Sequence, residues 1–192
     1  MGAGVLPIAF NGVSILYLLG KEQTNEWSDF GGSSNKKFET TFRTAIREGH
    51  EELSGMLGSE FEMARNVKKN YIGKFNNNRY TSYLFHTYYD SKLPIYFNRN
   101  YQFVKNTTPY IVDRQHNGLY EKKEIKWFCK DELYELNLRP FYKSIIFPII
   151  ENEKKIEILF AEKYSLNNLN NYVQQNGILD TRAKEYEIQE NQ

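Results

Sequence analysis

The segment formed by residues 30–56 constrains this chain most, because it combines a predicted helix with a cluster of acidic side chains. Three glutamates, Glu48, Glu51 and Glu52, stand at positions i, i+3 and i+4. With about 3.6 residues per helical turn, their carboxylates share one face of the helix. Like charges this close repel one another, and a hard divalent cation is a partner that neutralises them well.

A helix with glutamates at this spacing is commonly a solvated surface helix, so the pattern alone does not establish a metal site. Two neighbouring features favour the metal site over the solvated helix. Arg47 and Glu39 add charged groups at fixed spacings from the cluster, and the glycine pair Gly31 and Gly32 precedes the helix. Glycine lets a backbone approach a ligand closely.

The segment resembles the Nudix box, G-x5-E-x7-R-E-U-x-E-E-x-G-U, where U is a bulky aliphatic residue. The charged positions agree at the required spacings, and they are Glu39, Arg47, Glu48, Glu51 and Glu52. The glycine frame is displaced at both ends. Gly32 stands one residue early, and Gly49 takes an aliphatic position. Ser54 replaces the closing glycine, and Gly55 follows it. The sequence is therefore similar to the Nudix hydrolase superfamily over residues 32–55.

The resemblance implies a magnesium or manganese site. Glu51 and Glu52 would be the principal metal ligands, and Glu48 would be a ligand or the general base. The carbonyl oxygen of Gly32 would be a further ligand. A later loop usually supplies one more carboxylate in this family, and we expect Glu121 in that position, ahead of Glu124.

The resemblance also implies roles for the other two charged positions of the box. Arg47 would belong to the catalytic group by orienting Glu48. Glu39 would support the site by pairing with Arg47.

The implied activity is hydrolysis of a pyrophosphate bond in a nucleoside diphosphate linked to another moiety, by a water that the metal activates. Substrates in such families include nucleoside triphosphates, nucleotide sugars, dinucleotides and RNA caps, and the box does not choose among them. The net charge of +1 gives no support to the RNA cap. The alternative is a non-catalytic Nudix-like module that binds a nucleotide or RNA, for which loss of the box glutamates would be the sign.

The order of the predicted elements indicates an α/β fold. Apolar runs at residues 4–10 and 13–19, joined by Asn11-Gly12, predict a hairpin. Trp27 to Phe30 predicts a short core strand. We expect a helix over residues 40–53 whose buried stripe is formed by Phe42, Ala45, Ile46, Gly49 and Leu53.

The later part of the chain is predicted from similar signals. We expect paired strands over 65–74 and 79–89, a long loop over 94–117 with a short helix near 99–105, and a strand over 124–128. Helices are expected to begin at 130 and to cover 139–149, with a strand over 155–162 and a helix over 165–175. The resemblance implies a Nudix-like α/β/α sandwich with a mixed sheet over residues 1–150. Residues 151–192 would be a C-terminal extension, packed in part on the same domain.

Composition limits the cellular setting. The 192 residues suit one domain with an extension. No apolar run approaches the roughly 20 residues that span a bilayer, and the N-terminus lacks the pattern of a signal peptide. The single cysteine, Cys129, excludes an internal disulfide and is typical of a reducing compartment. We therefore expect a cytoplasmic protein with a small-molecule nucleotide substrate and no membrane partner, and the family's tendency to form dimers leaves a homodimer open.

The three histidines are weighed separately from the box. His50 faces away from the glutamates by spacing and is expected on the surface, whereas His86 is expected to be packed in its strand. His116 lies in the predicted long loop and is a candidate substrate contact.

Overall fold

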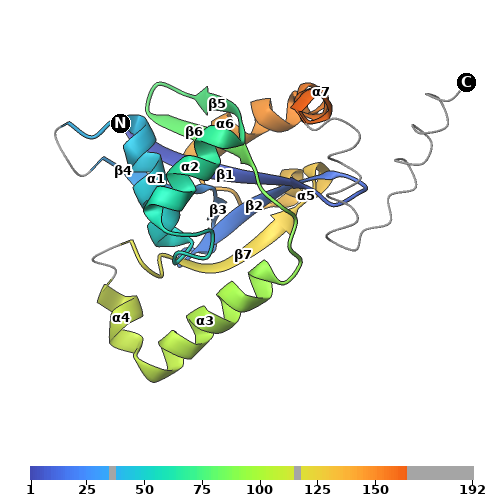
Figure 1. Ribbon diagram of the computed structural model, residues 1–192. Coiled ribbons are helices and arrows are strands. Elements are labelled where there is room, and N and C mark those ends of the chain that lie inside the picture. Colours follow the sequence, from blue (N-terminus) through green and yellow to red (C-terminus); the bar gives the residue numbers. More distant parts are fainter. Residues whose placement is uncertain (35–37, 115–117, 164–192) are drawn as a thin grey trace, which may run out of the picture.

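The computed structural model describes residues 1–34, 38–114 and 118–163, and its centre is a mixed β-sheet (Figure 1). Within these residues the sheet has seven strands. They are β1 (Gly2–Phe10), β2 (Ile15–Glu22), β3 (Trp27–Ser28), β4 (Phe30–Ser33), β5 (Tyr71–Asn76), β6 (Tyr80–His86) and β7 (Lys122–Phe128). The main order is β3-β2-β1-β6-β5, with β4 paired to β1 and β7 paired to β2. The pair β1–β6 is parallel, and the other strand pairs are antiparallel.

Helices cover both faces of this sheet. They are α1 (Thr41–Glu52), α2 (Glu60–Lys69), α3 (Leu93–Thr107), α4 (Pro109–Arg114), α5 (Lys130–Glu135), α6 (Pro140–Glu151) and α7 (Glu153–Lys163). Side chains of α1, α2 and α3 share one apolar cluster with the sheet, and side chains of α5, α6 and α7 share another. None of the helices within the described ranges has the length and apolar character needed to cross a membrane. The predicted α/β fold, with a mixed sheet between two helical layers, is confirmed.

Alternation along the central strands separates the two clusters. In β1, Val5 packs towards α1, whereas Leu6 and Ile8 pack towards α6. In β2, Leu18 packs on the side of α1 and Leu19 packs on the side of α6. Successive side chains of a strand point to opposite faces, so a central strand covered on both sides is apolar along its whole length.

The predicted hairpin between β1 and β2 is confirmed. Asn11 Oδ1 accepts hydrogen bonds from the backbone amides of Val13 and Ser14, each at 2.9 Å. Gly12 has a φ of 90°, a value that glycine adopts without strain. Trp27 and Phe30 are buried core residues, as expected.

The strand predicted over residues 65–74 is wrong for its first half, which belongs to α2. The Ser59 hydroxyl accepts a hydrogen bond from the Glu62 amide, and the Glu62 carboxylate accepts one from the Ser59 amide. This capping box fixes the start of the helix. Met63 and Val67 are fully buried one helical turn apart, so packing against the core favours a helix over a strand here. Strand β5 therefore begins only at Tyr71. The second strand of the pair, β6, ends at His86 instead of residue 89 and is buried on both faces.

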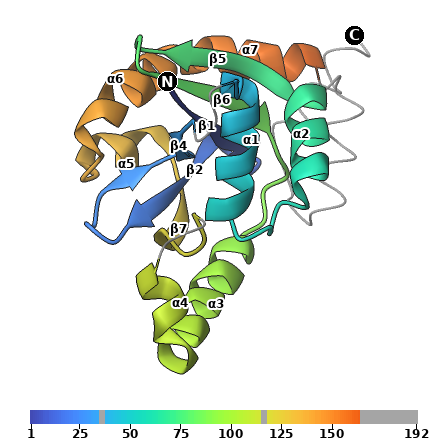
Figure 2. The same cartoon turned by 90° about the vertical axis from the view of Figure 1, so that its left-hand side faces the viewer.

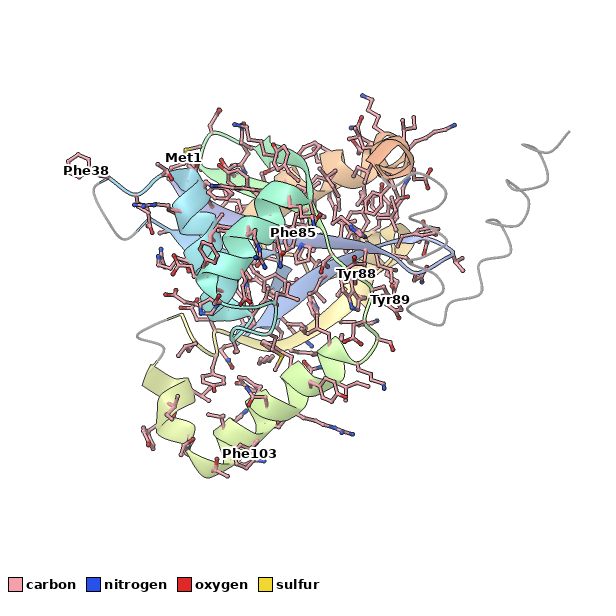
Figure 3. All side chains as sticks on the ribbon, viewed as in Figure 1. Met1, Phe38, Phe85, Tyr88, Tyr89 and Phe103 are labelled. Carbon is pink, nitrogen blue, oxygen red and sulfur yellow. The ribbon has the colours of Figure 1, made fainter. Side chains whose placement is uncertain are left out.

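The helix expected near residues 99–105 is present as part of α3, but the long loop predicted around it is wrong, because α3 and α4 occupy residues 93–107 and 109–114. Buried residues at helical spacing hold α3, and they are Leu93, Phe97, Tyr101 and Val104. Exposed aromatic residues on the opposite face obscure this pattern in the sequence. Phe103, for example, is 66% exposed and points away from the sheet (Figure 3). Together, α3 and α4 project from one end of the molecule (Figure 2).

The strand predicted over residues 155–162 is a helix, α7. Ile156 and Phe160 are buried one helical turn apart and join the apolar cluster that contains Ile149 of α6. Phe160 packs edge-on against His86, with ring centroids 4.8 Å apart, so His86 is packed as expected. The helix predicted over 165–175 lies outside the described residues, and the division of the chain at residue 150 stays a prediction.

The remaining expected elements are present. β7 and α5 cover the predicted strand and helix, and α6 continues past Pro148 to Glu151. The connection between β5 and β6 is a turn in which Asn77 Oδ1 accepts from the amides of Arg79 and Tyr80, at 3.3 and 3.0 Å.

Candidate functional site

Helix α1 begins and ends at local signals near the predicted positions. The Thr40 hydroxyl caps the helix by accepting a hydrogen bond from the Arg43 amide at 3.2 Å. At the other end, Ser54 and Gly55 have positive φ values of 51° and 69° and close the last turn. The displaced closing glycine of the box therefore still ends the helix, although Ser54 shares the left-handed conformation.

Gly49 stands where the box has an aliphatic residue because α1 lies very close to β1. A Cβ atom at Gly49 would overlap Cγ2 of Val5 and would lie 3.1 Å from Sδ of Met63. Both neighbours are fully buried. The glycine thus brings α1 against the sheet and fixes the depth of the glutamate face.

The two glycines of β4 serve different purposes. A Cβ atom at Gly32 would lie 2.7 Å from the carboxylate atoms of Glu48, so the missing side chain leaves room for that carboxylate. A Cβ atom at Gly31 would overlap the hydroxyl of Tyr80. Gly32 therefore borders the glutamate face despite its displaced position in the sequence, whereas Gly31 admits a core tyrosine.

Arg47 joins three carboxylates. Its Nε and Nη2 donate to the two oxygens of Glu39, at 3.1 and 3.3 Å. Its Nη1 donates to Glu51 Oε2 at 3.0 Å, and Nη2 lies 2.9 Å from Glu48 Oε1. The predicted pairing with Glu39 is present, and the contact with Glu48 has the geometry of an orienting residue. Burial alone would lower the pKa of Arg47, but the hydrogen bonds to Glu39 and the charge of Glu48 raise it.

Crowding and burial act on the glutamates of α1. Burial raises the pKa of Glu48, the Arg47 guanidinium opposes this, and the charges of Glu51 and Glu121 raise the pKa further. Burial likewise raises the pKa of Glu51, again against the effect of Arg47. Both carboxylates are thus harder to ionise than free glutamates unless another cation joins them.

Glu52 points into the protein and is 2% exposed. Its Oε2 accepts a hydrogen bond from the Gly31 amide at 2.7 Å, and its Oε1 lies 3.6 Å from Nζ of Lys122. Burial raises the pKa of Glu52 well above its ordinary value, and the Lys122 ammonium opposes this.

Lys122 and its partners are site residues that sequence reasoning missed. Lys122 is fully buried and donates to Glu22 Oε1 at 3.0 Å and to Ser28 Oγ at 2.8 Å. Glu22 also accepts from Arg139 Nη1 at 2.6 Å. One signal was available, since Lys122 directly follows the candidate ligand Glu121 in the sequence.

Glu121 is better placed than Glu124 to be the additional carboxylate. The charge of Glu121 raises the pKa of both Glu48 and Glu52 and is the largest like-charge effect on Glu52. Glu124 instead pairs with Lys21 across β2 and β7, at 3.4 Å.

The segment after α4 returns to this glutamate face. Gly118 has a φ of 70°, and a Cβ atom there would lie 2.7 Å from Glu51 Oε2. Nearby, Gln23 Nε2 donates to the hydroxyl of Tyr101 at 2.9 Å and to the carbonyl of Tyr120 at 3.2 Å. The projecting helices α3 and α4 are therefore attached beside the glutamates, while His116 lies outside the described residues.

The donor chemistry of this region fits Mg²⁺ or Mn²⁺, which prefer carboxylate oxygens. Within the described residues, seven carboxylates face three cations, which are Arg47, Lys122 and Arg139. One of the seven is Asp29, a buried residue between β3 and β4 that is affected by the charges of Lys122 and Arg139. The acids are Glu22, Asp29, Glu39, Glu48, Glu51, Glu52 and Glu121. Among the described residues, however, no three His, Cys, Asp or Glu side chains converge as a metal-binding group. Among the described side chains, Arg47 and Lys122 engage the carboxylates, and these acids outnumber the cations beside them.

Comparisons with known proteins found similar chains only among solved structures. No protein-family model matches the sequence, and no curated protein matches it. The Nudix hydrolase RenU from M. smegmatis is 15% identical with a TM-score of 0.45, covering 78% of this chain and 83% of that chain. An Ap4A hydrolase from C. elegans is 13% identical with a TM-score of 0.45, covering 84% and 97%. NrtR from Shewanella oneidensis is 9% identical with a TM-score of 0.46, covering 98% and 84%. Each of these solved structures is similar to this chain at 15% identity or less and at a TM-score below 0.5.

Proposed function

We propose that this chain is a Nudix hydrolase that cleaves a pyrophosphate bond in a nucleoside diphosphate linked to another moiety. The observation that carries the proposal is the surplus of carboxylates around one face of α1. Glu48, Glu51 and Glu52 lie on that face, and the charge of Glu121, the residue before β7, acts on Glu48 and Glu52. A divalent cation bound to these carboxylates would add the positive charge that this face lacks. The same cation would allow a substrate with two negative phosphates to approach the face.

The residues that would hold Mg²⁺ or Mn²⁺ are Glu51, Glu52 and Glu121, with Glu48 as a further ligand or the base and the carbonyl of Gly32 beside them. When bound, such an ion offsets phosphate charge and lowers the pKa of a coordinated water. Glu48 is suited to accept a proton from the attacking water, because its raised pKa lies closer to neutrality than that of a free glutamate.

Arg47 would position these groups without touching the substrate. Its contacts with Glu39, Glu48 and Glu51 restrict the rotamers of two carboxylates on the reactive face. A planar guanidinium suits this role because it presents several donors in a fixed geometry. Glu39 in turn holds Arg47, through two hydrogen bonds.

Substrate selection would come from outside α1. Gly118, which follows helices α3 and α4 in the chain, borders Glu51. Loops and insertions beside a conserved kind of site commonly decide which substrate enters. We therefore assign the choice of the group linked to the nucleoside diphosphate to this projection, and the RNA cap remains without support.

A second candidate function is a non-catalytic Nudix-like module that binds a nucleotide or RNA. The ion pairs made by Arg47 and Lys122 favour it, because they already neutralise part of the glutamate face. This candidate predicts nucleotide binding with no turnover in the presence of either cation.

The test is a screen of nucleoside diphosphate derivatives with Mg²⁺ and with Mn²⁺, in which released phosphate products are detected. We expect turnover of at least one compound, and loss of turnover with a chelator. Glu51→Gln should reduce turnover on the order of 100-fold or more while circular dichroism shows a folded protein.

The matched control is Glu135→Gln, which changes an exposed glutamate of α5 on the other face of the sheet. It should hydrolyse the same compound at the wild-type rate. Binding of nucleotides without any hydrolysis would instead establish the second candidate, and turnover that survives the chelator would rule out the metal site.

A further inference from the structure

Lys122 is a fully buried cation whose location calls for an explanation. A buried ammonium loses its hydration and is tolerated only when acids and hydrogen bonds replace it. Its Nζ contacts Glu22 at 3.0 Å, Ser28 at 2.8 Å and Glu52 at 3.6 Å. One of these three partners is a glutamate of the Nudix-like box.

The fold provides space for the Lys122 side chain at Gly20. A Cβ atom at Gly20 would lie 2.8 Å from both Cγ and Cδ of Lys122. It would also lie 2.9 Å from Cε1 of Phe30, so neither the lysine stem nor the aromatic ring leaves room for a side chain. The path of Lys122 towards Glu52 is thus part of the packing between β2 and β7.

The two acids beside Lys122 are not equivalent. Glu22 also accepts a hydrogen bond from Arg139 at 2.6 Å, so it keeps a cation when Lys122 is removed. Within the described residues, Lys122 is the one cation in salt-bridge contact with Glu52. Removal of Lys122 would therefore leave Glu52 without a salt-bridge cation among the described residues, whereas Glu22 would keep Arg139.

We propose that Lys122 competes with a divalent cation for Glu52 and thereby sets the metal affinity of this site. The inference rests on the proposed function, because it assumes that Glu52 is a metal ligand. Lys122 is a positioning residue that acts through Glu52. Its ammonium lies against Oε1 while the Gly31 amide holds Oε2, and a second positive charge near that carboxylate is repelled by the first.

The test compares wild type with Lys122→Met by calorimetric titration of the full chain with Mn²⁺ alone. We expect Lys122→Met to bind Mn²⁺ at least tenfold more tightly. We also expect a larger rise in melting temperature on adding Mn²⁺ to this variant, because the ion replaces the lost charge. The control is Lys126→Met, which removes an exposed lysine of the same strand, paired with Glu132, and should leave both readouts unchanged.

Two further variants separate this role from a merely structural one. Lys122→Met combined with Glu52→Gln should bind Mn²⁺ no more tightly than Glu52→Gln alone, because Lys122 acts only through that carboxylate. If Lys122→Met folds only with Mn²⁺ present, the metal has taken over the charge and the inference stands. If it does not fold at all, Lys122→Gln is measured in its place, since its amide keeps hydrogen-bond donors in the buried position without the positive charge.

The outcomes separate the inference from the proposed function. An affinity for Mn²⁺ within about twofold of wild type, or a gain that persists beside Glu52→Gln, overturns the role of Lys122 and leaves the hydrolase proposal intact. If neither wild type nor Lys122→Met binds Mn²⁺, both fail. If only Lys122→Met binds it, competition by Lys122 is demonstrated in its strongest form.

Discussion

Asp29, between β3 and β4, is a fully buried carboxylate with two hydroxyl donors. Tyr80 donates to its Oδ1 at 2.8 Å and Ser82 donates to its Oδ2 at 2.5 Å. Burial raises the pKa of Asp29 to about 6, although both hydrogen bonds oppose the change. Tyr80 reaches this acid only because Gly4 and Gly31 lack side chains that would overlap its hydroxyl.

This raised pKa predicts a pH-dependent loss of stability. The folded-state pKa of about 6 exceeds the ordinary value of 3.8, so the stabilising contribution is complete below pH 3.8 and is lost as the pH rises through 6. Between pH 4 and pH 7, the free energy of unfolding of wild type should therefore fall by up to about 3 kcal/mol relative to Asp29→Asn. Urea unfolding at several pH values measures the difference.

Asp113→Asn is the matched control, because Asp113 is exposed on α4. It should follow wild type at every pH. Parallel stability profiles for wild type and Asp29→Asn would show that Asp29 does not titrate in this range.

At the residue scale, the sequence predicts ion pairs within one local motif better than contacts between distant segments. The spacing of Glu39 and Arg47 is enough to expect their pairing, because both belong to a recognisable pattern. The contact between Glu52 and Lys122 is not predictable in this way, since it joins α1 to β7 and depends on the room left by Gly20. Such contacts depend on strand register and on how closely a helix packs against the sheet. Local sequence patterns predict neither of these properties.

At the scale of elements, the depth of α1 against β1 is set by Gly49. Alanine is intrinsically better than glycine in a helix by about 1 kcal/mol, yet its Cβ would overlap the fully buried Val5. We expect Gly49→Ala to lower the free energy of unfolding by about 1–3 kcal/mol through overpacking. Thermal and urea unfolding both measure this change.

Gly73→Ala in β5 is the control, because a Cβ atom at Gly73 would meet nothing within 4 Å. It should stay within about 0.5 kcal/mol of wild type. A stabilising effect of Gly49→Ala would mean that α1 sits farther from β1 than the structure shows.

Elements with strong local signals are the ones that the sequence predicts. The hairpin at Asn11-Gly12 and helix α1 have a turn motif, a cap and a regular apolar spacing. In α2, the alternation of residues 65–74 resembles a strand, and only the capping box of Ser59 and Glu62 indicates otherwise. In α3, exposed aromatic residues such as Tyr96 and Phe103 hide the buried face, because exposure is a property of the tertiary structure.

At the scale of the whole molecule, the candidate site gathers parts from distant segments. Helix α1 provides the glutamates, β4 provides the glycines that border them, β7 provides Lys122, and Glu121 directly precedes β7. The parallel pairing of β1 with β6 and the antiparallel pairing of β2 with β7 set the sheet around them. The box predicts the glutamate face, and only the assembled sheet shows that Lys122 shares it.

The measurement that tests the central claim most directly is turnover of a hydrolysed nucleoside diphosphate derivative in water enriched in ¹⁸O. We predict one ¹⁸O atom per turnover in a single phosphate-containing product, only with Mg²⁺ or Mn²⁺ present, and little product from Glu48→Gln. Absence of product across the screen would contradict a metal-dependent pyrophosphate hydrolase built on α1. So would product without ¹⁸O, or undiminished turnover by Glu48→Gln.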